Sequence, residues 1–100
     1  MRHRVDFTPD AVRHFKKLSQ AVRPLLKDAI RAQLIESDPE ETTSNKFRLR
    51  RVSPLADYEL RAGRWRVFYR VDHKSRSVIV TLIGEKRGAS LFVEGEELKL

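Results

Sequence analysis

The sequence of 100 residues contains no cysteine, which excludes a disulfide scaffold and any metal site with thiolate ligands. Its apolar runs are short of the roughly 20 residues that cross a bilayer as a helix, and the N-terminal MRHRVDF lacks the apolar core of a signal peptide. The three histidines, His3, His14 and His73, share no metal-ligand spacing. We therefore predict a single domain, residues 1–100, that works in the cytoplasm without a metal, a cofactor or a membrane.

Positive charge is what this chain has in excess. It has 21 lysines and arginines against 14 acidic residues, a formal net charge of +7. The basic residues gather between Lys46 and Arg87, whereas residues 36–41 and 94–97 are acidic. This asymmetry predicts a polyanionic partner, either nucleic acid or an acidic protein segment. A membrane surface is disfavoured because no basic amphipathic helix with a broad aromatic face is present.

The apolar pattern predicts a strand, then two helices, then several strands. The first strand is expected at His3–Phe7, and Thr8 then caps a helix over Pro9–Leu18. A second helix follows Ser19 and carries its apolar stripe as far as Leu34, so the two helices form a hairpin. The later strands are expected at Phe47–Val52, Tyr58–Arg61, Arg64–Asp72, Val78–Ile83 and Leu91–Val93. The sequence therefore predicts an α+β fold, with the N-terminal strand and a helical hairpin packed on an antiparallel sheet of about four strands.

The most informative segment is Tyr58–Val71, with the sequence YELRAGRWRVFYRV. Its second strand alternates strictly, which puts two sets of side chains on opposite faces of a sheet. One set is Trp65, Val67, Tyr69 and Val71, and the other is Arg64, Arg66, Phe68 and Arg70. From the first set, Val67, Tyr69 and Val71 are expected to pack, with Val80 and Leu82, against Phe15, Leu18, Leu26 and Ile30. The second set suits phosphates and stacked bases, although a solvated face with Asp57 and Glu59 paired to arginines is the alternative.

Two further basic segments extend this surface. One is the run from Lys46 to Arg51, and the other is the expected loop Glu85–Gly88, directly after the central strand. A basic run alone is often only a solvated face, but neighbouring strands would bring these rows into one groove. The residues expected to bind nucleic acid are Lys46, Arg48, Arg50, Arg51, Arg61, Phe68 and Arg70. We expect Arg48, Arg50, Arg66 and Arg87 to converge on the sheet face or edge away from the helices.

The order of a leading strand, a helical hairpin, YELR, GRWRVFYRV, an apolar strand and IGEKRG resembles the RelE/ParE superfamily of bacterial toxins. The resemblance covers nearly the whole chain and is strongest from Phe47 to Gly88. It implies the RelE-like microbial RNase fold and a toxin encoded beside a cognate antitoxin, whose extended or helical segment masks the basic groove. The RelE branch cleaves mRNA in the ribosomal A site, whereas the ParE branch poisons DNA gyrase.

The resemblance also implies roles for individual residues. In RelE-like nucleases a strand arginine matches Arg66 and an arginine after the central strand matches Arg87, and both would stabilise charge on the scissile phosphate. The two lysines of RelE fall at Asp57 and Glu59, and its C-terminal tyrosine falls near Phe92 or Val93, so a basic group such as Lys46 or Lys86 would have to substitute. The predicted function is a metal-independent, ribosome-dependent mRNA endonuclease with Arg66, Arg87 and Lys86 as catalytic residues. The alternatives are a DNA gyrase inhibitor and a nucleic-acid-binding module without toxin activity.

Overall fold

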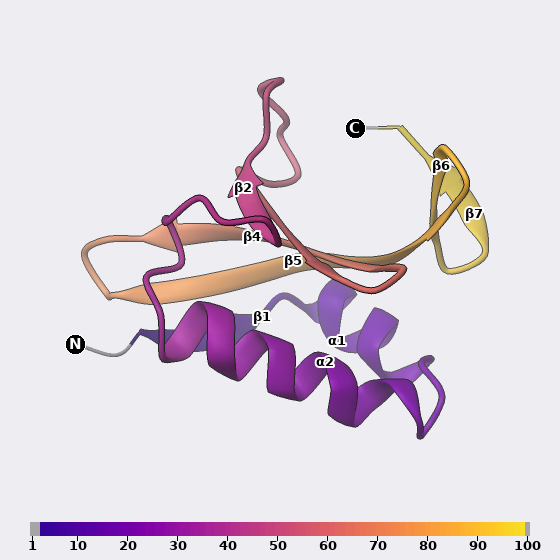
Figure 1. Ribbon diagram of the computed structural model, residues 1–100, viewed down its shortest axis with the longest axis horizontal. Coiled ribbons are helices and arrows are strands. Elements are labelled where there is room, and N and C mark those ends of the chain that lie inside the picture. Colours follow the sequence, from indigo (N-terminus) through magenta and orange to yellow (C-terminus); the bar gives the residue numbers. More distant parts are fainter. Residues whose placement is uncertain (1–2, 100) are drawn as a thin grey trace.

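The computed structural model describes residues 3–99, and its helices lie beneath a twisted sheet (Figure 1). The helices are α1 (Pro9–Lys16) and α2 (Val22–Ile30), and α2 continues into the π-helical turn η1 (Arg31–Ile35). The strands are β1 (Arg4–Phe7), β2 (Lys46–Arg48), β3 (Tyr58–Ala62), β4 (Trp65–Asp72), β5 (Ser77–Arg87), β6 (Ser90–Val93) and β7 (Glu96–Leu98). The predicted α+β architecture, with a helical hairpin on one face of the sheet, is confirmed.

The helix starts follow from local sequence. The Thr8 hydroxyl accepts a hydrogen bond from the N–H of Ala11 at 3.2 Å, so the expected threonine cap begins α1 with Pro9 in its first turn. The Ser19 hydroxyl accepts from the N–H of Val22 at 3.3 Å at the start of α2. Helix α1 therefore begins where the sequence indicated, whereas α2 begins three residues after Ser19, at Val22, and its N-cap residue Ala21 makes no side-chain cap.

The sheet has seven strands rather than about four. Strands β2 to β7 run in sequence order with antiparallel neighbours, whereas β1 lies parallel to the first residues of β5. The long strand β5 therefore has β1 beside its beginning and β6 beside its end. Strands β1 to β6 all lie in or overlap segments where the sequence predicted a strand, so the count of about four was lower than the prediction's own segments. Only β7 was not expected, because it is acidic and exposed, without the apolar alternation that marks a strand.

The sheet carries a core on each face. On the helix face, Leu26, Ile30 and Leu34 pack with the strand residues Leu60, Val67, Tyr69, Val78 and Val80. We call the opposite side the outer face, where Ala56, Phe68, Leu82 and Leu91 form a smaller cluster. The placement of Leu82 differs from the prediction that it faces the helices. The β4–β5 register shifts between Phe68 and Tyr69, which leaves Thr81 without an opposite residue and turns Leu82 to the outer face.

Candidate nucleic-acid interface

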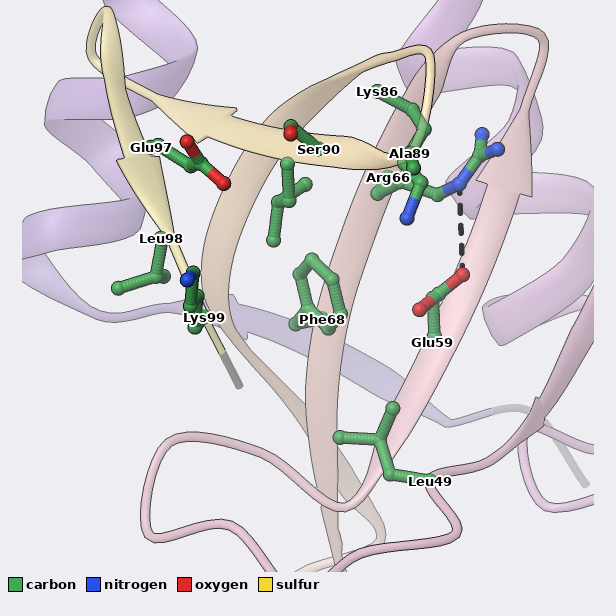
Figure 2. Close-up of a pocket in the computed structure, with 11 residues that line it drawn as sticks. Leu49, Glu59, Arg66, Phe68, Lys86, Ala89, Ser90, Glu97, Leu98 and Lys99 are labelled. Atoms are coloured by element: carbon green, nitrogen blue, oxygen red, sulfur yellow. Dashed lines mark ion pairs between the residues drawn. The ribbon is translucent and has the colours of Figure 1, made fainter.

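The outer face contains a hollow of about 300 Å³, walled by the β6–β7 hairpin on one side and closed by Leu49 on another (Figure 2). Phe68 lies in its middle, and Arg66 and Lys86 lie together at one end. The complete lining is Leu49, Glu59, Arg66, Phe68, Lys86, Ala89, Ser90, Leu91, Glu97, Leu98 and Lys99. The hollow thus combines an apolar floor with basic and acidic groups at its rim.

Strand pairing explains why Arg66 and Lys86 meet. Arg66 is opposite Gly84 in the β4–β5 ladder, and Lys86 follows Gly84 by two residues, so both side chains point to the outer face. Gly84 has no side chain, and β6 occupies the space that one would fill. A Cβ atom there would be 2.9 Å from the carbonyl oxygen of Phe92. The glycine therefore lets β6 cross closely enough to form a wall of the hollow.

The guanidinium of Arg66 is held by several contacts. Its Nη1 donates to the carbonyl oxygens of Gly63 at 2.7 Å and Trp65 at 2.9 Å, and its Nε lies 3.5 Å from Oε2 of Glu59. The Arg66 side chain is only 13% exposed, and burial lowers its pKa, although an arginine stays protonated. Nη2 has no hydrogen-bond partner among the described residues, so it remains available to an anion.

Lys86 lines the hollow without an acidic partner among the described residues. It is half-buried, and within residues 3–99 its Nζ forms no hydrogen bond or ion pair. The arginines around it are paired with acids: Arg61 with Glu59 at 3.0 Å, and Arg64 and Arg87 with Glu85 at 3.5 and 2.9 Å. A half-buried ammonium without a counter-ion attracts a negatively charged ligand.

Phe68, expected to stack on a base, is only 1% exposed and belongs to the outer core. It is covered because the loop after β2 brings Leu49 and Ala56 against it. A more accessible ring is Phe47, over which the guanidinium of Arg61 lies at 4.8 Å from the centroid. Phe68 therefore supports the hollow, whereas Arg61 and Phe47 extend the surface toward the edge of the sheet.

Lys46 and Arg48 lie on the helix face, away from the hollow. Lys46 is fully buried, its Nζ donates to the carbonyl oxygens of Gln33 and Asp38 at 2.7 Å each, and burial lowers its pKa. Arg48 donates to the hydroxyl of Tyr58 at 3.1 Å. The alternation of β2 accounts for both positions, because only Phe47 of this strand points outward. We therefore leave Lys46 and Arg48 out of the candidate interface.

The expected convergence of Arg66 and Arg87 is wrong. Residues 84–87 are not a loop, because β5 continues to Arg87, and adjacent strand residues point to opposite faces. Arg87 lies 4.7 Å from the ring centroid of Phe92 and lines a separate cavity of about 250 Å³ together with His14 and Trp65. Of the two residues, only Arg66 lines the hollow.

Three further basic residues lie in or against the loop between β2 and β3, beside the hollow. Arg50 and Arg51 are exposed in the segment between β2 and β3. Arg70 donates to the carbonyl oxygen of Pro54, and its Nε is buried without a hydrogen-bond partner. Arg70 therefore braces the loop, and Arg50 and Arg51 present charge at its surface.

Between residues 3 and 99, no group of three or more histidine and acidic side chains is arranged to hold a metal ion. No helix in the same range has the length and apolar character needed to cross a membrane.

Solved structures share this architecture. A chain of the toxin–antitoxin complex RelBE2 from Mycobacterium tuberculosis is 23% identical with a TM-score of 0.70, over 87% of this chain and 100% of that chain. A chain of the archaeal RelE–RelB complex from Pyrococcus horikoshii is 22% identical with a TM-score of 0.66, over 90% and 100%. The isolated RelE toxin from E. coli is 23% identical with a TM-score of 0.61, over 87% of each chain.

The chain has the RelE fold. No protein-family model and no curated protein sequence matches it, so the likeness lies in the structure. At these identities the shared RelE fold does not assign roles to residues.

Proposed function

We propose that this protein is the toxin of a type II toxin–antitoxin system and that it cleaves mRNA on the ribosome without a metal ion. The observation that carries the proposal is the pair Arg66 and Lys86 at one end of a concave outer face, on the fold that RelE toxins share. Cleavage of mRNA would inhibit translation and arrest growth, and translation places this activity in the cytoplasm.

The chemistry follows from the charges in the hollow. Attack by a ribose 2′-hydroxyl forms a bond from its oxygen to phosphorus and breaks the bond to the 5′-oxygen of the next nucleotide. The hydroxyl proton passes to water and the departing 5′-oxygen takes a proton from water, which leaves a 2′,3′-cyclic phosphate and a 5′-hydroxyl end. Negative charge builds on the phosphoryl oxygens during this step. Arg66, through Nη2, and Lys86, through its ammonium, are the groups that would donate hydrogen bonds to them. The exposed Arg50, Arg51 and Arg61 would position the neighbouring phosphates.

The second partner in the proposal is a cognate antitoxin. Structural neighbours from M. tuberculosis and P. horikoshii were solved as toxin–antitoxin and RelE–RelB complexes. The net charge of +7 favours an acidic partner and speeds its association by electrostatic steering.

Expression of matched variants tests the nuclease directly. Wild-type protein should arrest growth and leave mRNA cut within coding sequences. Arg66→Ala should lose on the order of 100-fold or more in cleavage, because one preorganised donor to the transition state is removed. Arg64→Ala is the control, since Arg64 is 70% exposed and pairs with Glu85 outside the hollow. Equal arrest by wild type and Arg66→Ala, with intact mRNA, would refute the nuclease.

The same experiment separates the two alternatives. Growth arrest with intact mRNA and gyrase-linked DNA breaks would identify the protein as a DNA gyrase inhibitor of the ParE type. A supercoiling assay with purified DNA gyrase would confirm that activity. Binding of RNA without arrest or cleavage would identify a nucleic-acid-binding module.

A further inference from the structure

A cation–π pair, Arg61 and Phe47, lies on the outer face beside the hollow. The guanidinium carbon of Arg61 is over the Phe47 ring, 4.8 Å from its centroid. Arg61 faces outward because it is opposite Arg66 in the β3–β4 ladder. Phe47 faces outward because it is opposite Glu59 in the β2–β3 ladder. The other cation–π pairs between residues 3 and 99 lie on the helix side of the sheet or in the separate cavity of about 250 Å³.

The guanidinium of Arg61 is fixed on one side and open on the other. Its Nε donates to Oε2 of Glu59 at 3.0 Å, and the same oxygen is 3.5 Å from Nε of Arg66. Glu59 therefore links the two guanidinium groups and sets their spacing. The Arg61 side chain is 49% exposed although Phe47 covers one side of it, so its other side faces solvent.

We propose that this pair binds one nucleobase of the RNA, the base beside the phosphate held by Arg66 and Lys86. The base stacks on the open side of the Arg61 guanidinium, and Phe47 supports that group from the opposite side. Every base has a flat π face that stacks on guanidinium groups and aromatic rings. Adjacent strands are about 4.8 Å apart, so Phe47 on β2 lies about 10 Å from Arg66 on β4, within reach of one nucleotide.

This inference rests on the proposed function, since it names a base-binding subsite for the RNA that is cleaved in the hollow. The plane of Arg61 stacks on the base, while its Nη groups donate from the edge of that plane to a neighbouring phosphate. Purines are favoured over pyrimidines because their larger ring system covers more of the guanidinium. RNA that lacks this base keeps its contacts with Arg66 and Lys86 but loses the stacking contact.

The test combines protein variants with mRNA that lacks a single base. Ribosomes carrying a short synthetic mRNA are mixed with increasing amounts of the full chain. Arg61→Lys keeps the charge but removes the plane, so half-maximal cleavage should need about tenfold more protein at an unchanged maximal rate. Phe47→Leu should need about threefold more, whereas Phe47→Tyr keeps a ring and should match wild type. The control is Arg64→Lys, which is 70% exposed, lies outside the hollow and should also match wild type.

The missing base identifies the contact. An abasic site is placed on either side of the scissile phosphate. At one of these positions wild-type protein should lose about tenfold, and Arg61→Lys should then lose nothing further, because the stacked base is already absent. If Arg61→Lys loses the same factor on intact and on both abasic mRNAs, Arg61 contacts only phosphate and the inference is overturned.

Binding of a short single-stranded RNA, with 2′-deoxyribose at the cut site, gives a measurement that does not depend on cleavage. Its affinity should show the same dependence on the base and on Arg61. Base-dependent binding with intact mRNA would count against the nuclease and support the subsite. Equal affinity with and without the base would overturn the subsite, whatever the cleavage. A wild-type chain that neither binds RNA nor cuts mRNA would overturn both. Circular dichroism of each variant verifies that the fold is retained.

Discussion

The substitution Lys46→Met tests whether Lys46 stabilises the fold or binds RNA. Methionine keeps the apolar stem of this fully buried side chain but removes the two hydrogen bonds to Gln33 and Asp38 at 2.7 Å. Bonds from a charged donor contribute about 1.5–3 kcal/mol each, while burying the ammonium costs part of that amount. We therefore expect a net loss of about 2 kcal/mol in the free energy of unfolding. For a domain of this size that lowers the Tm by about 8–16 °C.

Thermal unfolding followed by circular dichroism measures this effect, with the exposed Lys74→Met as the control. The pH dependence provides a second signature. Burial lowers the pKa of Lys46, so above that pKa and up to about 10.5 the unfolded chain binds more protons than the folded one. Wild-type stability should gain from this group as pH rises through that window, and Lys46→Met should lose the gain. A variant with wild-type Tm but no RNA cleavage would refute the structural role.

Two further predictions concern the β6–β7 hairpin that walls the hollow. Gly84→Ala puts a Cβ 2.9 Å from the carbonyl oxygen of Phe92, so it should cost roughly 1–3 kcal/mol in urea denaturation and reduce cleavage by displacing β6. Arg13 chiefly holds the pKa of Glu94 at about 2, and burial lowers the pKa of His14. Stability should therefore fall as pH drops from 6.5 toward the lower pKa of His14, and again from 4.5 toward 2. In a series of Tm values against pH, Glu94→Gln should flatten the second decline and extend the first to lower pH, because Glu94, 3.2 Å from Nε2 of His14, raises the pKa of His14 against the effect of burial.

Strand periodicity was sufficient to predict which side chains of the central strand β4 lie on each face of the sheet. The alternation from Trp65 to Val71 correctly separated Val67 and Tyr69 from Arg66 and Phe68. It failed beyond the bulge, because an unpaired Thr81 leaves no mark in the local pattern and reverses every later residue of β5.

The candidate site was predicted only in part, for two physical reasons. A lysine at a strand start is usually exposed, and the burial of Lys46 depends on carbonyl groups 13 and 8 residues earlier in the chain, which periodicity does not reveal. Arg87 was grouped with Arg66 because both match arginines of RelE-like nucleases, and residues 84–88 were expected to form a loop. Had that segment been read as a strand, alternation would have put Lys86 and Arg87 on opposite faces.

Lys86 and Arg87 provide the most direct test of the claim that RNA is cleaved in the outer-face hollow. They are adjacent basic residues at the same end of β5, and they line different cavities. In a purified translation reaction, mRNA ends are mapped after adding Lys86→Ala or Arg87→Ala. The structure predicts that Lys86→Ala loses on the order of 100-fold in cleavage while Arg87→Ala cuts as wild type does. Full cleavage by Lys86→Ala together with a loss of cleavage in Arg87→Ala would contradict the account. That result would indicate that the reaction takes place on the helix side of the sheet.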